Sequence, residues 1–334
     1  MATFKVYLVD TFTRPHQGFS GAPAAVCLLP ADIRWSREKL GQIASELGQP
    51  ETAFIQPLFK REQAVVLDGQ REYREASRFT LRWLTPHVEV KFGGHAALAA
   101  GHVLFHELDN STDFLQFDTL GGPLCITREQ YQGMERVALL IPADPPYLVD
   151  HYHQNSTKDV QLASLPVERR QLLQELTMLI TSALGPMAPP LHTVVFGRKS
   201  HCLLIHVDAA ASQLYDLQPV FTPDVLALGY ECKLSCLVLA VTTPHSSSDK
   251  RPSRPDVVMR CFAPWLGVSE APSVGAAYAL AGSYWTQQLG RPEFRVLQGH
   301  VRQAELSLLV DPNHKDQVQL AGCAVTTLRG TYEL

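Results

Sequence analysis

The sequence predicts an α/β protein built as two similar halves. Residues 94–108 and 275–289 are almost wholly apolar and show helical spacing, and a helix that is apolar on every side is expected to be buried on every side. The same pattern precedes both segments. Each copy begins with an arginine, Arg82 or Arg260. An apolar residue, a Thr or Ala, a Pro, a Val and a Glu follow in this order, and a Gly then opens the helix. Two such copies indicate a duplicated unit, with chance similarity as the alternative because few identities support it.

Length and composition agree with two globular domains. The chain has 334 residues, of which 46% are hydrophobic and 19% are charged. The net charge of −4 and the scattered basic residues give no reason to expect nucleic acid or a membrane as a partner. The seven cysteines are widely spaced, which is typical of reduced thiols. The first residues lead directly into a strand pattern without a secretory signal, so we expect a cytoplasmic protein.

The predicted elements of the first half follow one another in order. β-Branched and aromatic residues predict a strand at 4–11, and apolar runs predict further strands at 24–29 and 78–85. Between them, residues 36–47 have apolar side chains at helical spacing. Ser36 is suited to cap the first turn of that helix.

Both predicted apolar helices begin at a turn that could bind an anion. Gly93 and Gly94 open the first helix, and Val274, Gly275 and Ala276 open the second. Free N–H groups and the helix dipole favour negative charge at such a start, such as a carboxylate or an enolate. The alternative is that the glycines only allow a tight entry into the helix.

Two side chains in the first half are candidates for proton transfer. Glu51 lies between a proline turn and an apolar strand, where burial would raise the pKa of its carboxyl. The alternative is a solvated turn glutamate. His95 is at the start of an apolar helix, where its cationic form is disfavoured. The alternative is a packing or capping histidine. No nucleotide-binding, hydrolase or metalloprotease motif is present. The H-x-H at His151 and His153 has no further ligand at suitable spacing, so we expect no metal.

The motifs of the chain resemble, in order and over nearly its whole length, those of the PhzF-like family. The matching segments are Gly21-Ala22-Pro23-Ala24-Ala25-Val26, Glu51-Thr52-Ala53-Phe54, Arg82 to Pro86 with Gly94-His95-Ala96, Arg260 to Pro264 with Gly267 to Glu270, and the pair Gln298 and Arg302.

This resemblance implies a diaminopimelate epimerase-like fold, in which each half wraps a sheet around one central helix. The first domain would comprise 1–118 with about 318–334, and the second 119–317. The resemblance further implies a cofactor-independent isomerase or cyclase of secondary metabolite biosynthesis, acting on a small molecule in the cleft between the domains. Glu51 would be its general acid/base and His95 would assist. A homodimer is also implied.

Several polar residues of the family motifs are replaced by small or apolar ones in this chain. The replacements stand at Ala22, Gly93, Ala97, Ala271, Val274 and Ala276. The expected substrate-binding positions are Gly21, Ala22, Gly93, Gly94, Ala271, Val274, Gly275 and Ala276. We therefore expect a more apolar substrate than is usual for the family. Two alternatives stay open: a catalytically inactive binding protein of the same fold, and family chemistry maintained by the remaining polar groups.

Overall fold

The chain forms two compact units. The computed structural model describes residues 3–14, 17–58, 71–131, 133–151, 166–186, 188–243, 254–271, 273–299 and 301–334. Unit 1 comprises residues Met1–Ile141, Arg302–Ser307 and Gln319–Leu334, and unit 2 comprises Pro142–Val301 and Leu308–Val318. No described helix is long and apolar enough to cross a membrane.

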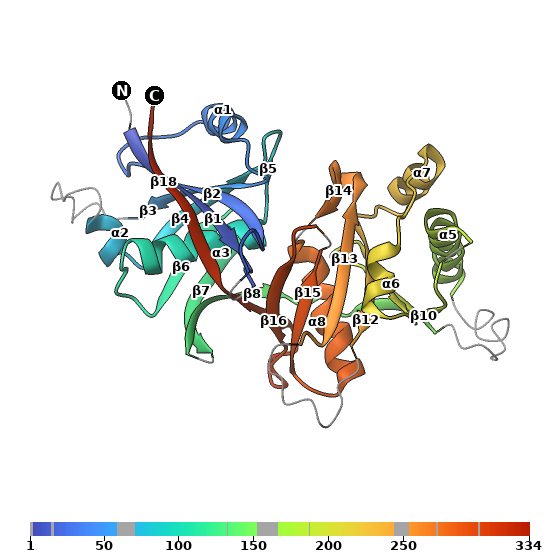
Figure 1. Cartoon of the computed structure of the whole chain (residues 1–334). Coiled ribbons are helices and arrows are strands. Elements are labelled where there is room, and N and C mark those ends of the chain that lie inside the picture. The colour runs from blue at the N-terminus through green and yellow to red at the C-terminus, as the bar shows by residue number, and fades with distance from the viewer. Residues whose placement is uncertain are drawn as a thin grey trace. The chain divides into compact units, whose positions relative to one another are not determined.

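Unit 1 wraps a sheet around helix α3 (Figure 1). Its strands are β1 (Thr3–Thr11), β2 (Ala22–Leu28), β3 (Thr52–Pro57), β4 (Arg78–Leu84), β5 (Glu89–Val90), β6 (Phe114–Thr119), β7 (Gly122–Tyr131), β8 (Met134–Pro142) and β18 (Ala324–Glu333). Its helices are α1 (Arg37–Leu47), α2 (Arg71–Glu75) and α3 (Gly94–His102), which continues into the π-helical turn η2 (Val103–Glu107). All nine residues of α3 are buried, as the apolar pattern predicts.

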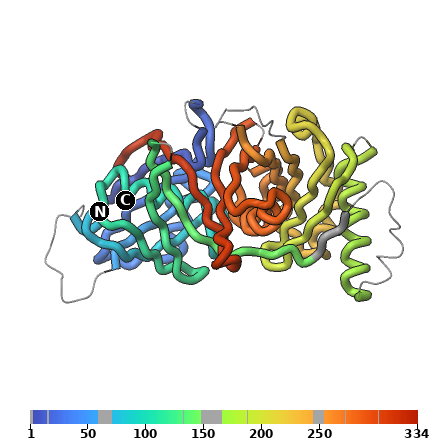
Figure 2. The backbone as a smooth tube through the Cα atoms, turned by 90° about the horizontal axis from the view of Figure 1, so that it is seen from below, coloured from blue at the N-terminus to red at the C-terminus, as the bar shows by residue number. Residues whose placement is uncertain are grey.

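Unit 2 is built in the same way around helix α8 (Gly275–Leu289), with its strands lying around the helix in Figure 2. Its strands are β9 (Pro146–His151), β10 (Leu191–Gly197), β11 (Cys202–Val207), β12 (Cys236–Thr242), β13 (Val257–Ala263), β14 (Val268–Ala271) and β15 (Glu293–Gln298). Its other helices are α5 (Val167–Leu184), α6 (Ala211–Asp216), α7 (Pro223–Glu231) and the 3-10 turn η3 (Pro264–Leu266). Strands β16 (Ala304–Leu309) and β17 (Gln317–Gly322) contain residues of both units.

The strand pairing repeats between the units. In unit 1, β2 is parallel to β3, β3 is antiparallel to β4, and β4 is parallel to β6 and antiparallel to β5. In unit 2, β11, β12, β13, β15 and β14 pair in the same order and with the same directions. The predicted two similar halves are therefore confirmed.

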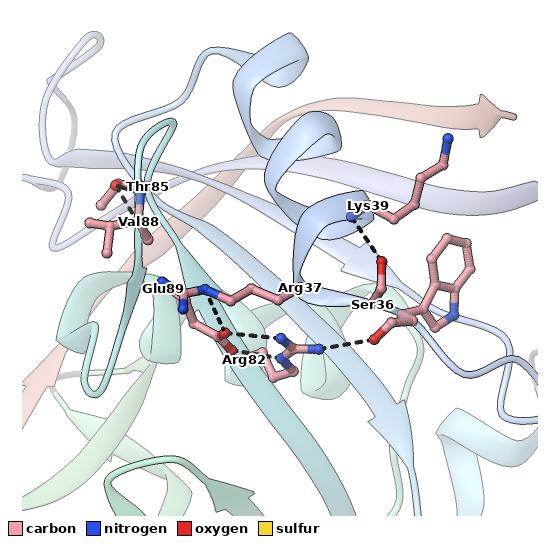
Figure 3. A network of polar contacts seen from close by, with 8 residues as sticks. Ser36, Arg37, Lys39, Arg82, Thr85, Val88 and Glu89 are labelled. Carbon is pink, nitrogen blue, oxygen red and sulfur yellow. Dashed lines mark hydrogen bonds and ion pairs between the residues drawn. The ribbon is translucent and has the colours of Figure 1, made fainter.

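The repeated Arg and Glu of the sequence form the same ion pair in each unit. Arg82 donates from Nε and Nη2 to the two carboxylate oxygens of Glu89, at 2.6 and 2.9 Å (Figure 3). Arg260 donates in the same forked arrangement, from Nε and Nη2 to the two carboxylate oxygens of Glu270, at 2.9 and 2.8 Å. Such a fork gives two parallel charge-assisted hydrogen bonds. The third guanidinium nitrogen, Nη1, also donates to a backbone carbonyl, that of Trp35 or of Leu214.

Each arginine thereby holds the connection between the two parallel strands against the strand that precedes the central helix. In unit 1 this connection contains α1, whose first turn is capped by Ser36 as predicted, with Oγ accepting from the N–H of Lys39 at 3.1 Å. Arg37 adds a contact of 3.6 Å to Glu89, also visible in Figure 3.

The division between the units differs from the expected domain boundary. Residues 119–141 and Arg302–Ser307 were expected in the second domain, but they lie in unit 1. For residues 119–141 the pairing of the strands explains the difference, since β7 is antiparallel to β6 along the whole length of β6 and β8 is antiparallel to β7. The C-terminal segment lies in unit 1 from Gln319, where β18 pairs with β1.

Candidate functional site in unit 1

Glu51 immediately precedes β3 and is fixed there by its backbone. Its carbonyl accepts a hydrogen bond from the N–H of Ala25 in β2, at 3.0 Å. The next residue, Thr52, pairs with Ala25 in the parallel ladder. Glu51 is thus anchored at the first rung of β3, with its side chain 19% exposed.

His95 comes to Glu51 from the first turn of α3. Its Nδ1 lies 3.5 Å from Oε2 of Glu51, and its side chain is only 10% exposed. Within the described parts of the chain, Oε2 of Glu51 and Nε2 of His95 are buried and have no hydrogen-bond partner. Buried polar atoms usually have a hydrogen-bond partner. A carboxyl and an imidazole that lie side by side and each lack one therefore indicate a place for a ligand or a reacting group.

Two opposing effects act on the acidity of Glu51. Burial raises the pKa of its carboxyl above the ordinary value, and the nearby His95 lowers it. Burial is the larger effect, because removal from water disfavours the charged form more than the single imidazole favours it. A raised pKa makes the ionised carboxyl a stronger base and keeps the protonated form available over a wider range of pH.

Gly93 leaves room for this carboxyl. A Cβ on Gly93 would lie 2.3 Å from Oε2 of Glu51 and 3.1 Å from Cγ of Trp83. The carboxyl therefore occupies the space of the missing side chain, and the Trp83 indole borders the same space. Trp83 is 1% exposed. Burial of the carboxyl among such neighbours is the physical origin of its raised pKa.

We expect Gly93→Ala to destabilise the protein by about 1–3 kcal/mol, because the added methyl overlaps the Glu51 carboxyl. Urea unfolding would measure this loss. Gly18→Ala is the control, since a Cβ there meets nothing within 4 Å. In the background of Glu51→Ala the overlap with the carboxyl is absent, so Gly93→Ala should be less harmful there. Equal losses in both backgrounds would contradict the proposed packing.

The predicted binding positions Gly21 and Ala22 lie at the start of β2. Gly21 has φ of +85°, and a Cβ there would lie 2.3 Å from the carbonyl oxygen of Thr11, so no other residue fits. Arg302 holds this turn by donating from Nε to the Gly21 carbonyl at 2.6 Å. Ala22 is buried, and its carbonyl accepts from the hydroxyl of Thr11 at 3.0 Å. Because β2 and β3 are parallel, the turn and Glu51 lie at the same edge of the sheet.

The other predicted positions lie at two helix starts. Gly94 is the first residue of α3, and Gly93 caps it without a side-chain hydrogen bond. In unit 2, Val274 caps α8, again with no side-chain bond, and Gly275 and Ala276 form its first turn. Ala271 ends β14, where its carbonyl accepts from Nε2 of Gln298 at 3.0 Å. The structure thus joins Glu51, Gly93 and His95 in one cluster, and gives no polar side chain at Ala271, Val274 or Ala276.

Trp83 is the site residue that sequence reasoning missed. It directly follows Arg82, the arginine of the repeated pattern. The buried side chains of Phe79, Leu81 and Trp83 alternate along β4 and form its inward face. That alternation could have placed the indole inside. Trp83 and the Glu51 carboxyl both border the position that a Cβ on Gly93 would take, and no local sequence pattern predicts this.

The cluster of Glu51, Gly93 and His95 has the groups that proton transfer requires. It sets a carboxyl with a raised pKa beside an imidazole, and both side chains keep a buried polar atom open. The described parts of the chain contain no group of three or more His, Cys, Asp or Glu side chains able to hold a metal ion.

Comparison with known proteins identifies the family. The family model described as phenazine biosynthesis-like protein matches residues 9–330. The chain belongs to this family. An "uncharacterized isomerase" of Halalkalibacterium halodurans is 31% identical over 333 residues, covering 98% of each chain.

Solved structures agree on the fold. A PhzF family protein of Enterococcus faecalis is 23% identical and has a TM-score of 0.70, covering 99% of this chain and 100% of that one. A hydroxyproline epimerase of Agrobacterium vitis, solved with bound trans-4-hydroxy-L-proline, is 10% identical and has a TM-score of 0.52, covering 99% and 93%. The fold is the diaminopimelate epimerase-like fold expected from the family motifs.

Proposed function

We propose that this protein is an isomerase-type enzyme in which Glu51 moves a proton within a small, largely apolar substrate. The observation that carries the proposal is the pair of Glu51 and His95, which lie 3.5 Å apart and each keep a buried polar atom without a hydrogen-bond partner. The name of the relative in Halalkalibacterium halodurans supports the same class of reaction.

The chemistry requires one group that can take a proton and return it at another carbon. The raised pKa makes the ionised Glu51 a stronger base than an exposed glutamate, and makes the protonated form a competent acid afterwards. His95 lies within reach of the same carboxyl oxygen and would orient it or donate to the substrate. The N-terminus of α3 has no side-chain cap, so its free N–H groups would stabilise negative charge that develops on the substrate.

The neighbours of the two central helices support a more apolar substrate than a free amino acid. Ala22, Gly93 and Ala97 replace polar residues of the family motifs in unit 1. Without their hydroxyl, amide or thiol groups, the surroundings offer fewer hydrogen bonds to a charged substrate, and more room and apolar contact. Isomerisation, or cyclisation assisted by the acid, is the reaction class that such a site serves.

The test is a search for turnover with the purified full chain and metabolite extracts of the native source. An isomerase converts a compound into another of the same mass. Liquid chromatography with mass spectrometry should therefore show, after the protein is added, a compound of unchanged mass at a new retention time. If a compound is retained by the protein but never converted, the enzyme proposal fails and a binding protein remains.

The raised pKa of Glu51 has a consequence for stability. The folded protein favours the protonated carboxyl, because the pKa of Glu51 is higher in the folded than in the unfolded state. The contribution of Glu51 to the free energy of unfolding is therefore full below the pKa of the unfolded state and is lost as pH rises through the pKa of the folded state. Glu51→Gln removes this loss. Urea unfolding at pH 4, 6 and 8 should show the variant gaining on wild type with pH, by about 1.4 kcal/mol per unit of pKa displacement. A difference that is constant or falls with pH would contradict the raised pKa.

A further inference from the structure

Three thiols gather inside unit 2. Cys202 begins β11, Cys236 begins β12, and Cys261 lies in β13; all three are fully buried. Cys202 and Cys236 are directly opposite each other in the parallel ladder, and their Sγ atoms are 2.9 Å apart. Both thiols are free.

This geometry is close to that of a disulfide. A disulfide requires sulfurs about 2.0 Å apart and Cα atoms about 4.4–6.8 Å apart. Directly paired residues of neighbouring strands, which lie about 4.8 Å apart, meet the second requirement without backbone movement. The sulfurs have to approach by only about one ångström. We propose that Cys202 and Cys236 are an oxidisable pair that closes to a disulfide across β11 and β12.

The surroundings of the pair indicate that an oxidant reaches Cys202 first. Burial raises the pKa of Cys202 well above its ordinary value, so the resting pair is neutral and stays reduced without an oxidant. The hydroxyl of Ser235 donates to the carbonyl of Ser200 at 2.7 Å, and its oxygen lies 3.3 Å from Sγ of Cys202. Ser235 and Ser200 are half-buried, so this side of Cys202 lies one layer beneath the surface.

The reaction balances with hydrogen peroxide as the oxidant. The sulfur of Cys202 attacks one peroxide oxygen, the O–O bond breaks, and a sulfenic acid and one water form with the proton of the thiol. The sulfur of Cys236 then attacks the sulfenic sulfur, the S–O bond breaks, and a second water leaves with the second thiol proton. Two thiols lose two electrons, and one peroxide becomes two waters.

The pair lies in unit 2 at the place that corresponds to the Glu51 site of unit 1. The repeated arginines fix the correspondence between the two sheets, because Arg82 pairs with Phe54 and Arg260 pairs with Leu239. Three residues before these partners, Cys236 takes the place of Glu51, and in the neighbouring parallel strand Cys202 takes the place of Ala24. Cys261 pairs with Ala271 in the neighbouring strand. Unit 2 therefore carries thiols at the edge of the sheet where unit 1 carries its acid, and the disulfide would stiffen that edge.

The experiment is graded oxidation of the native full chain with hydrogen peroxide, followed by alkylation in denaturant and peptide mapping without reductant. We expect a Cys202–Cys236 linked peptide that dithiothreitol releases, and a fall of about two in the seven alkylatable thiols. Cys202→Ser and Cys236→Ser should each abolish the link, and Cys261→Ser should keep it.

The wild-type map alone can overturn the proposal, even if a variant fails to fold. Modification confined to the half-exposed Cys125 and Cys323, with Cys202 and Cys236 fully alkylated, would contradict it. A link to Cys261, or a link that forms only after unfolding in urea, would contradict it as well.

Discussion

Glu51→Gln is expected to lower kcat/KM on the converted compound by about 10²- to 10⁴-fold, the usual loss when a general acid/base is removed. The amide keeps the volume of the carboxyl in the space beside Gly93, so packing is maintained. It can neither accept nor return the proton. Steady-state kinetics by chromatography and mass spectrometry would measure the loss, and circular dichroism would verify the fold.

His95→Asn is the matched variant for this experiment. The imidazole contacts the same carboxyl oxygen at 3.5 Å, but in the proposed mechanism it assists and does not carry the proton between carbons. We therefore expect a smaller loss of kcat than for Glu51→Gln. Full activity of Glu51→Gln, with a much larger loss for His95→Asn, would assign the proton transfer to the histidine.

Glu270→Ala is expected to destabilise the protein by about 3–5 kcal/mol, because it leaves the Arg260 guanidinium buried without its counter-ion. The Arg260 side chain is 1% exposed, so water cannot replace the carboxylate. The loss should appear as a lower midpoint of urea unfolding.

The duplicated fold supplies the control for this second experiment. Glu89→Ala removes the same fork in unit 1, but the Arg82 side chain is 29% exposed and Arg37 also contacts Glu89. Water can solvate the freed Arg82, so we expect a clearly smaller loss. Equal losses for the two variants would show that burial of the arginine does not decide the energetics of the pair.

Local signals in the sequence predicted much of the fold. The start of both central helices at Gly94 and Gly275 followed from the repeated pattern, and the cap at Ser36 followed from its hydroxyl before an amphipathic helix. The Arg and Glu of the repeated pattern form the same ion pair in both units. These features depend on residues within a few turns of one another.

What the sequence did not predict depends on contacts between distant segments. The expected helix 94–108 changes to a π-helical turn at Val103, although its apolar pattern continues. Residues 119–141 belong to unit 1 because of strand pairing, which composition does not encode. The position of the Glu51 carboxyl requires the missing Cβ of Gly93, and these two residues come from segments that meet only in the folded unit.

The central claim is that Glu51 is a buried acid/base with a raised pKa. The most direct test is a carbon NMR titration of the side-chain carboxyls in labelled protein, with Glu51→Gln used to assign the Glu51 signal. The account predicts that Glu51 titrates above the ordinary glutamate value of about 4.3. Titration at or below that value would contradict it, because the carboxyl would then be solvated or firmly paired and no longer poised for proton transfer.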